Sequence, residues 1–253
     1  MAKKHTEKPR KATPRKSAGR RTRGRLIVID GIDGSGKATQ VGLLKKRLAK
    51  DGVKVKTIDF PRYYDNFFGE LIGEYLSGKY GDFIEVDPRV ASVLYAADRF
   101  ETSATIRQWL ADGHTVLADR YVSANQIHQG GKIENPKKRK EFIEWLEQME
   151  HGVFGIPRPD LVIYLDVPFE VSQSWVKQKI NQRSKKYLKN GRKDVAEDNL
   201  KHLKVSRNAA LWLEKNNANW EKVTCCDGMV CMPPEAVHEQ VVEIVAARLK
   251  HIR

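Results

Sequence analysis

A glycine-rich segment behind a short apolar run constrains the fold of this chain more than any other feature of its sequence. The run is Leu26 to Asp30, whose β-branched residues are typical of a buried strand. Glycines follow it with the spacing G-x-x-x-x-G-K, and apolar residues at helical spacing come next. Glycines let successive backbone N–H groups curl around phosphate oxygens, and Lys37 is placed to reach the β- and γ-phosphates. We therefore predict a loop that binds the phosphates of a nucleotide such as ATP, formed by Gly31, Ile32, Asp33, Gly34, Ser35, Gly36, Lys37, Ala38 and Thr39.

The last position of this motif departs from the usual pattern. A Ser or Thr there normally gives a hydroxyl to Mg²⁺, and Ala38 has none. Thr39 comes one residue later and points about 100° further around the helix, so it should not replace that hydroxyl. Mg²⁺ would then depend on phosphates, water and a carboxylate, which a small octahedral ion accepts. Asp33, inside the loop, is the nearest candidate.

Strands and helices alternate along the rest of the chain. Apolar runs and alternations predict strands at residues 26–30, 53–60, 115–118, 161–165 and 220–225. Helical periodicity predicts helices at residues 39–50, 89–110, 136–149, 194–213 and 234–249, and Pro168 opens a further one. This order indicates an α/β domain with a P-loop NTPase fold, a five-stranded parallel sheet and helices on both faces. Ligands should bind beyond the carboxyl ends of the strands.

The positive charge of the chain is concentrated at its N-terminus. Residues 1–25 hold eleven Lys and Arg against the single Glu7, which accounts for +10 of the formal net charge of +14. Residues 1–24 contain almost no apolar side chain, so we expect a disordered basic tail before a domain at residues 25–253. A solvated tail is the favoured interpretation. Contact with nucleic acid through residues 1–24 is the alternative, and it is not expected to matter for function.

The remaining composition favours a cytoplasmic protein. No apolar run approaches the length of a membrane span. The three cysteines, Cys225, Cys226 and Cys231, lack the spacing of a zinc site, and we expect them to be buried or half-buried thiols in a reducing compartment.

Two arginines follow predicted strands directly. Arg62 ends the sequence Asp59-Phe60-Pro61-Arg62, and Arg120 ends Ala118-Asp119-Arg120. Both should lie at the same edge of the sheet as the glycine loop, because the carboxyl ends of parallel strands meet there. Guanidinium groups suit phosphate, and phosphoryl transfer depends on positioning and charge. Together with the loop, the two arginines indicate a site where two phosphates meet.

Five motifs, taken in order, resemble the thymidylate kinase family. They are G-I-D-G-S-G-K, F-P-R, A-A-D-R at 96–99, D-R-Y and P-D-L-V-I-Y-L-D at 159–166, and the resemblance covers about residues 25–250. It implies an enzyme that transfers the γ-phosphate of ATP to dTMP, giving dTDP and ADP, with Mg²⁺. It also implies a homodimer, although no residue pattern locates the interface.

The resemblance implies roles for individual residues that would bind dTMP. Arg62 and Arg120 would hold its phosphate, and Asp33 would contact the 3′-hydroxyl of the sugar. Tyr95 occupies the position of a Phe that stacks on thymine, while Arg99 would donate to O4 and Asn125 would contact the base edge. Residues 95 and 99 share a helix face, which suits this arrangement, although a core aromatic is the alternative for Tyr95. His128 stands where many members carry a Tyr beside the sugar, and a structural His is the alternative there.

The resemblance also implies a mobile LID at residues 183–193. Members with no Arg at the Gly34 position use a LID arginine to neutralise the transferred phosphate, so Arg183 or Arg192 should act, and the sequence does not decide between them. Asp33, Asp119 and Glu197 are the expected metal-site carboxylates. Asp119 would orient Arg120 or the waters of the metal, and an exposed residue at a helix start is the alternative for Glu197.

Two other functions stay open at this stage. Another nucleoside monophosphate or deoxynucleoside kinase would use the same loop with a different base pocket. A nucleic-acid-binding P-loop ATPase would use the basic tail and would show strong salt dependence. A GTPase is disfavoured because no N-K-x-D motif is present.

Overall fold

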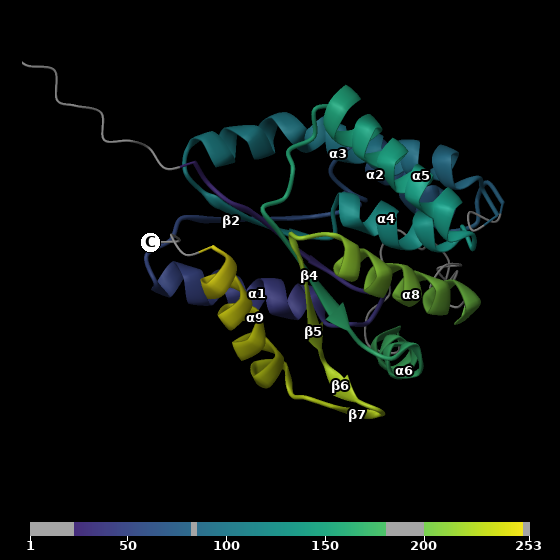
Figure 1. Ribbon diagram of the computed structural model, residues 1–253. Coiled ribbons are helices and arrows are strands. Elements are labelled where there is room, and N and C mark those ends of the chain that lie inside the picture. The colour runs from purple at the N-terminus through teal and green to yellow at the C-terminus, as the bar shows by residue number, and fades with distance from the viewer. Residues whose placement is uncertain (1–22, 82–84, 181–199, 250–253) are drawn as a thin grey trace, which may run out of the picture.

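Five parallel strands form the central sheet. The computed structural model describes residues 23–81, 85–180 and 200–249, without the side chains of residues 177–180. The sheet has the order β2-β3-β1-β4-β5, and every neighbouring pair in it is parallel (Figure 1). Its strands are β1 (Leu26–Asp30), β2 (Val55–Asp59), β3 (Thr115–Asp119), β4 (Leu161–Asp166) and β5 (Trp220–Thr224). The prediction of a five-stranded parallel sheet is confirmed.

Helices cover both faces of the sheet, as predicted. The helices are α1 (Lys37–Lys50), α2 (Phe67–Leu76), α3 (Pro88–Ala111), α4 (Val122–Gly131), α5 (Pro136–Glu147), α6 (Phe169–Ile180), α8 (Leu200–Asn216) and α9 (Pro234–Arg248). A π-helical turn, η1 (Gln148–Val153), continues α5. In Figure 1, α1 and α9 lie on one side of the sheet, and α3, α4, α5 and α8 lie on the other.

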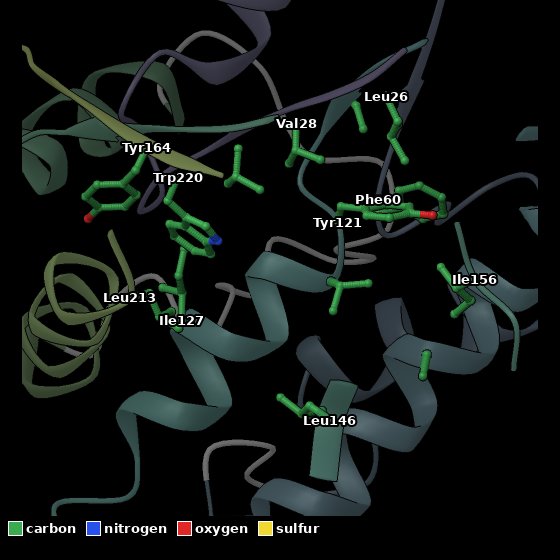
Figure 2. Packing of buried hydrophobic residues seen from close by; sticks show 14 of the residues in the cluster. Leu26, Val28, Phe60, Tyr121, Ile127, Leu146, Ile156, Tyr164, Leu213 and Trp220 are labelled. Atoms are coloured by element: carbon green, nitrogen blue, oxygen red, sulfur yellow. The ribbon is translucent and has the colours of Figure 1, made fainter. Parts of the chain in front are cut away.

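Strand side chains alternate between two hydrophobic clusters, which explains why both faces are covered. On β1, Leu26 and Val28 pack toward α3, α4, α5 and α8, in the cluster that Figure 2 shows. Ile27 and Ile29 pack on the opposite face with residues of α1 and α9. All four side chains are fully buried. A strand with two apolar faces must lie inside a sheet, and β1 has β3 on one side and β4 on the other.

Most of these helices were predicted from the sequence, but not all of them. The helices expected at residues 39–50, 89–110 and 234–249 are present with small shifts of their ends. The helix expected at 136–149 ends as an α-helix at Glu147, and only residues 200–216 of the one expected from 194 are described. Helices α2 and α4 were not anticipated. Asn66 begins α2 by accepting a hydrogen bond from the backbone N–H of Gly69, a capping signal that the sequence contained.

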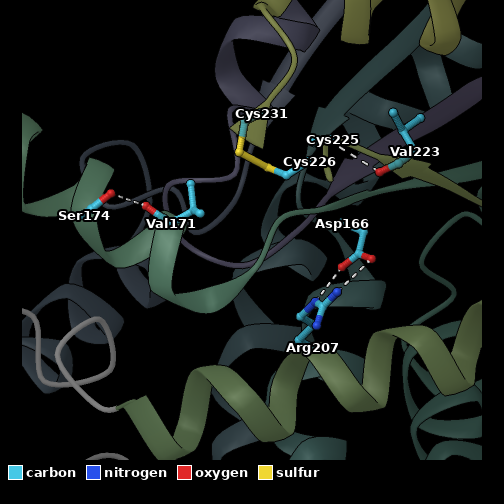
Figure 3. The surroundings of a disulfide bond; sticks show 8 residues. All are labelled: Asp166, Val171, Ser174, Arg207, Val223, Cys225, Cys226 and Cys231. Carbon is cyan, nitrogen blue, oxygen red and sulfur yellow. Dashed lines mark hydrogen bonds and ion pairs between the residues drawn. A yellow bond between two sulfur atoms is a disulfide. The ribbon is translucent and has the colours of Figure 1, made fainter. Parts of the chain in front are cut away.

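The expectation of three free thiols is wrong. Cys226 and Cys231 form a disulfide, and Cys225 is the free, buried cysteine (Figure 3). Two short antiparallel strands, β6 (Cys226–Asp227) and β7 (Val230–Cys231), place the two bonded residues directly opposite each other. Gly228 makes the reversal possible, because its φ of 57° is in the left-handed region. Spacing alone did not reveal this hairpin, whose strands are only two residues long.

Some expectations lie outside the described residues. The basic tail lies outside them, apart from residues 23 and 24. The LID at 183–193, with Arg183 and Arg192, and the metal-site candidate Glu197 also lie outside the described residues. Among the described helices, none has the length and apolar character needed for a membrane crossing.

Candidate active site

The glycine loop joins β1 to α1 and closes around the side chain of Lys37. Its Nζ donates to the carbonyl oxygens of Gly31 and Ile32, both at 3.0 Å. Burial, and then the charge of Arg120, lower the pKa of Lys37. Gly34 has a φ of 80°, and a Cβ there would lie 2.8 Å from the carbonyl oxygen of Ser172. An arginine could not occupy this position without moving α6.

Arg120 connects the loop to β3 and α4. It follows β3 directly and has a φ of 65°, a conformation that non-glycine residues rarely adopt. Its Nη2 contacts Oδ1 of Asp33 at 2.5 Å, and its Nη1 lies 2.8 Å from Nε2 of His128. Burial opposes the guanidinium charge, but the carboxylates of Asp33, Asp30 and Asp119 raise the pKa of Arg120 overall. The cation is therefore held by a direct contact with Asp33 and favoured by the nearby charges of Asp30 and Asp119.

Arg62 lies at the same edge of the sheet, beyond β2. Its guanidinium pairs with Asp65 at 2.8 Å and lies 3.6 Å from Asp59. Its backbone N–H points to the carboxylate of Asp98, which also accepts a hydrogen bond from Asn66. The side chain of Arg62 is 23% exposed, so it can contact an incoming ligand.

The register of the sheet and the charges place these residues in one region. Asp59 at the end of β2 is paired with Asp119 at the end of β3. Asp119 in turn lies within electrostatic reach of Lys37 and Arg120, while burial raises its own pKa. The structure therefore brings Lys37, Asp33, Arg120 and Asp119 together, with Arg62 at the neighbouring strand end.

Two of the residues expected to contact a base, Arg99 of α3 and Asn125 of α4, form a buried polar group with Glu150 of η1. Arg99 is 1% exposed and makes a bidentate ion pair with Glu150, through Nε and Nη2 at 2.7 Å each. Asn125 donates to Glu150 at 2.8 Å and to the carbonyl oxygen of Ser92 at 3.1 Å. Tyr95 is half-buried beside a small cluster that includes Ile72. The base contacts of Tyr95, Arg99 and Asn125 stay predictions.

His128 faces Arg120 and a second histidine. Its ring stacks on that of His202, with 5.5 Å between the ring centroids, and its Nδ1 lies 3.2 Å from Oγ of Ser206. An arginine can only donate hydrogen bonds, so Nε2 of His128 must accept and the ring is neutral. Burial and the Arg120 charge hold the pKa of His128 well below its ordinary value. The contact with the sugar expected for His128 stays a prediction.

The metal-site expectation rests on two described carboxylates. Asp33 lies in the loop beside Arg120, and the charges of both Lys37 and Arg120 act on the carboxylate of Asp119. Within the described residues, no group of three or more His, Cys, Asp or Glu side chains is arranged to hold a metal on its own. Hard carboxylate oxygens supplemented by substrate phosphates suit Mg²⁺, which rarely uses an all-protein cage. The residues present therefore fit this ion.

Several polar residues of the site were not predicted from the sequence. Asp98 lies within the A-A-D-R motif and could have been chosen as the partner of an arginine. Asp30 accepts hydrogen bonds from the N–H of Gly31 and the hydroxyl of Ser123, at the last position of β1. Glu150 and His202 had no usable signal, because each comes from a helix far along the chain from its partner.

The fold and the loop define the class as P-loop nucleotide-binding proteins. A sequence model described as thymidylate kinase matches residues 29–218, which is more than half of the chain. The chain therefore belongs to the thymidylate kinase family, whose phosphate donor is ATP.

Individual relatives agree with this assignment. A thymidylate kinase of Rhodopirellula baltica is 34% identical over 157 residues, 60% of this chain and 58% of that protein. One from Schizosaccharomyces pombe is 26% identical over 235 residues, 90% of this chain and 94% of that protein. The chain thus spans less than two thirds of the first relative and nearly all of the second. The solved structure of thymidylate kinase from Candida albicans, at 25% identity, covers 90% of this chain and 94% of its own, with a TM-score of 0.65.

Proposed function

We propose that this protein is a dTMP kinase, which transfers the γ-phosphoryl group of ATP to dTMP and releases dTDP and ADP. The observation that carries the proposal is the shared region of Lys37 and Arg120. Lys37 is the cation of the ATP loop, and Arg120 is a cation suited to the acceptor phosphate. The two lie within electrostatic reach of each other, and Asp33 contacts Arg120. Family membership supports the same reaction.

The geometry supports catalysis by positioning and charge. Lys37 rests on two neutral carbonyl oxygens, and phosphate oxygens are stronger acceptors, so its ammonium moves to the β- and γ-phosphates when ATP binds. Arg62 and Arg120 hold the phosphate of dTMP in line with the γ-phosphate. No general base is needed, because the acceptor is already a phosphate dianion. A LID arginine, Arg183 or Arg192, completes the neutralisation of the transferred group.

Asp33 and Asp119 would hold Mg²⁺ together with the phosphates, and Glu197 remains a third candidate. The ion supplies positive charge that offsets the charge developing on the phosphates. The carboxylate of Asp33 would have to bind the ion and Arg120 at the same time, since its Oδ1 already contacts Nη2 of Arg120.

Ala38→Ser should lower the Mg²⁺ concentration for half-maximal activity roughly three- to tenfold, because the hydroxyl adds the ligand that this loop lacks. Ala38 is exposed, so the larger side chain fits without displacing the core. The measurement is the initial rate of ADP release against free Mg²⁺ at saturating ATP. Thr39→Ser, one position further along α1, is the matched control and should change nothing. An unchanged Mg²⁺ dependence in Ala38→Ser would show that the ion does not lie beside this position.

The substrate is tested by coupled ADP release with ATP and a panel of dTMP, dUMP, UMP, CMP, dCMP, AMP and GMP. We expect the highest kcat/KM with dTMP. Faster turnover of another monophosphate would assign the protein to a different acceptor. ATP hydrolysis that responds to nucleic acid and not to any monophosphate would favour the P-loop ATPase alternative. The panel is wide because the thymidylate kinase of Candida albicans has broad substrate specificity.

We also propose a homodimer that forms through α3. Its exposed side bears apolar residues at alternating spacings of three and four, a pattern that suits helix–helix contact. These residues are Val90, Val93, Ala97, Phe100 and Ala104. Val90 is 59% and Phe100 is 50% exposed, which is unusual for large apolar side chains aligned in one stripe.

Phe100→Asp should weaken this dimer at least about 100-fold, because two-fold symmetry would bring like charges together in an apolar contact. Light scattering after gel filtration would measure the mass across a dilution series. Thr105→Asp, exposed on the same helix but outside the stripe, should leave the mass of the parent unchanged. A Phe100→Asp protein with the parent's mass at every concentration would place the interface elsewhere.

The cytoplasm is the proposed location, because dTMP and ATP are metabolites of the cell interior. Residues 1–24 have no role in the proposed reaction, and their deletion should leave it intact.

A further inference from the structure

Three polar side chains far apart in the sequence form one buried group in the region of the predicted base site. Arg99 of α3, Asn125 of α4 and Glu150 of η1 are 1%, 2% and 0% exposed. Glu150 accepts two hydrogen bonds from Arg99 and a third from Asn125, all between 2.7 and 2.8 Å. The loop and the phosphate-binding arginines do not use Glu150, so its buried charge requires a separate explanation.

The contacts of Asn125 fix the orientation of its side-chain amide. Nδ2 has two N–H donors, and both are used, one by the carbonyl oxygen of Ser92 and one by Oε1 of Glu150. Among the described residues, Oδ1 accepts no hydrogen bond, yet it is not one of the sealed polar atoms that lack a partner. This oxygen therefore retains contact with solvent. What Asn125 can offer a ligand is an acceptor.

The contacts of Arg99 leave it with donors to offer. Its three hydrogen bonds to Glu150 and to the carbonyl oxygen of Tyr121 use three of its five N–H groups. A guanidinium has no acceptor at all. Arg99 and Asn125, both anchored on Glu150, thus present one donor group and one acceptor atom.

We propose that Glu150 is a positioning residue that sets the base specificity of this kinase, by locking the Asn125 amide with its oxygen outward and holding Arg99 beside it. The inference rests on the proposed function and names the chemistry of its substrate. A donor next to an acceptor complements the edge of thymine or uracil, where C4=O accepts and N3–H donates. It opposes cytosine, whose N3 accepts and whose amino group donates. The site should therefore select pyrimidines that carry an N3–H imide.

The charged carboxylate of Glu150 stabilises only one orientation of the Asn125 amide. It has only acceptors, so it cannot pair with the oxygen of Asn125 if that amide turns over. A glutamine at 150 has the same shape and also has an NH₂ group, which could pair with the turned amide. It would also lose the charge that holds Arg99. Both effects weaken the distinction between an imide edge and a cytosine edge.

The test compares dTMP with dCMP in Glu150→Gln. We expect the ratio of their kcat/KM values to fall at least about tenfold from the parent's, since one misplaced hydrogen bond in a buried site is worth about that much. A purely structural role would lower the active fraction for both substrates equally and leave this ratio unchanged. The matched control is Asp166→Asn, which breaks another largely buried carboxylate pair, with Arg207 (Figure 3). It should lose stability and keep the ratio.

A second variant keeps the inference testable if Glu150→Gln fails to fold. Asn125→Ala leaves the pair between Arg99 and Glu150 in place and removes the acceptor together with the two donors of the amide, and it should lower the same ratio. A parent that does not phosphorylate dTMP would overturn the proposed function and this inference with it. This inference alone would be overturned if the parent prefers dTMP and the ratio is unchanged in Glu150→Gln. If Glu150→Gln does not fold, an unchanged ratio in Asn125→Ala would overturn it instead.

Discussion

Lys37→Met should lower kcat for dTMP phosphorylation by about two to three orders of magnitude, in line with the loss of one well-placed electrostatic donor at a transition state. The ammonium of Lys37 is the loop's own cation, and methionine of similar length has no charge to follow the transferred phosphoryl group. The rate of ADP release at saturating ATP and dTMP measures the effect.

The same substitution should not unfold the protein. Burial lowers the pKa of Lys37, so its charge is held at a cost that two backbone carbonyl oxygens offset only in part. Methionine removes that cost, and the thermal unfolding midpoint should stay level or rise. Lys46→Met, at an exposed position of α1, is the control and should keep full activity. A loss of kcat smaller than tenfold in Lys37→Met would remove Lys37 from the chemistry.

The parts of the fold that could be predicted are those with an uninterrupted local pattern. β1 is apolar on both faces, and such a run fits only the interior of a covered sheet. Helix α4 was missed because its buried face includes Ser123, Asn125, Gln126 and Gln129, which give no apolar stripe. Those polar residues are buried because tertiary partners satisfy them, and a sequence pattern does not contain those partners.

The residues of the candidate site also fall into those that a local pattern predicts and those that depend on tertiary contacts. Lys37, Arg62 and Arg120 follow strand ends or the loop, so the topology of a parallel sheet was enough to bring them to one edge. Glu150 comes from a π-helical turn at the end of α5, where one added residue changes which side chain faces inward. That insertion has no periodic signal, so the partner of Arg99 could not be found from the sequence.

The paired histidines behind Arg120 give the second large effect, a dependence of stability on pH. Burial, and then the charge of Lys132, lower the pKa of His202 to about 4, and burial lowers that of His128 as well. In the unfolded chain both should titrate near 6.5. The unfolded state therefore binds more protons between these values, so the stability is fully present above pH 6.5 and is lost as the pH falls toward 4. For His202 alone the loss amounts to about 3 kcal/mol.

Urea unfolding at pH 7.5, 6.5, 5.5 and 4.5 measures this loss as a falling free energy of unfolding. His202→Phe, which keeps a ring against His128, should flatten the decline between pH 6.5 and 4.5. His114→Gln, at the opposite end of β3 from Arg120, should keep the parent's slope. Asp98 and Asp119 have pKa values that burial raises, so they give the opposite slope and act equally in every variant. A decline in His202→Phe as steep as the parent's would mean that His202 does not lie in a buried, neutral pair.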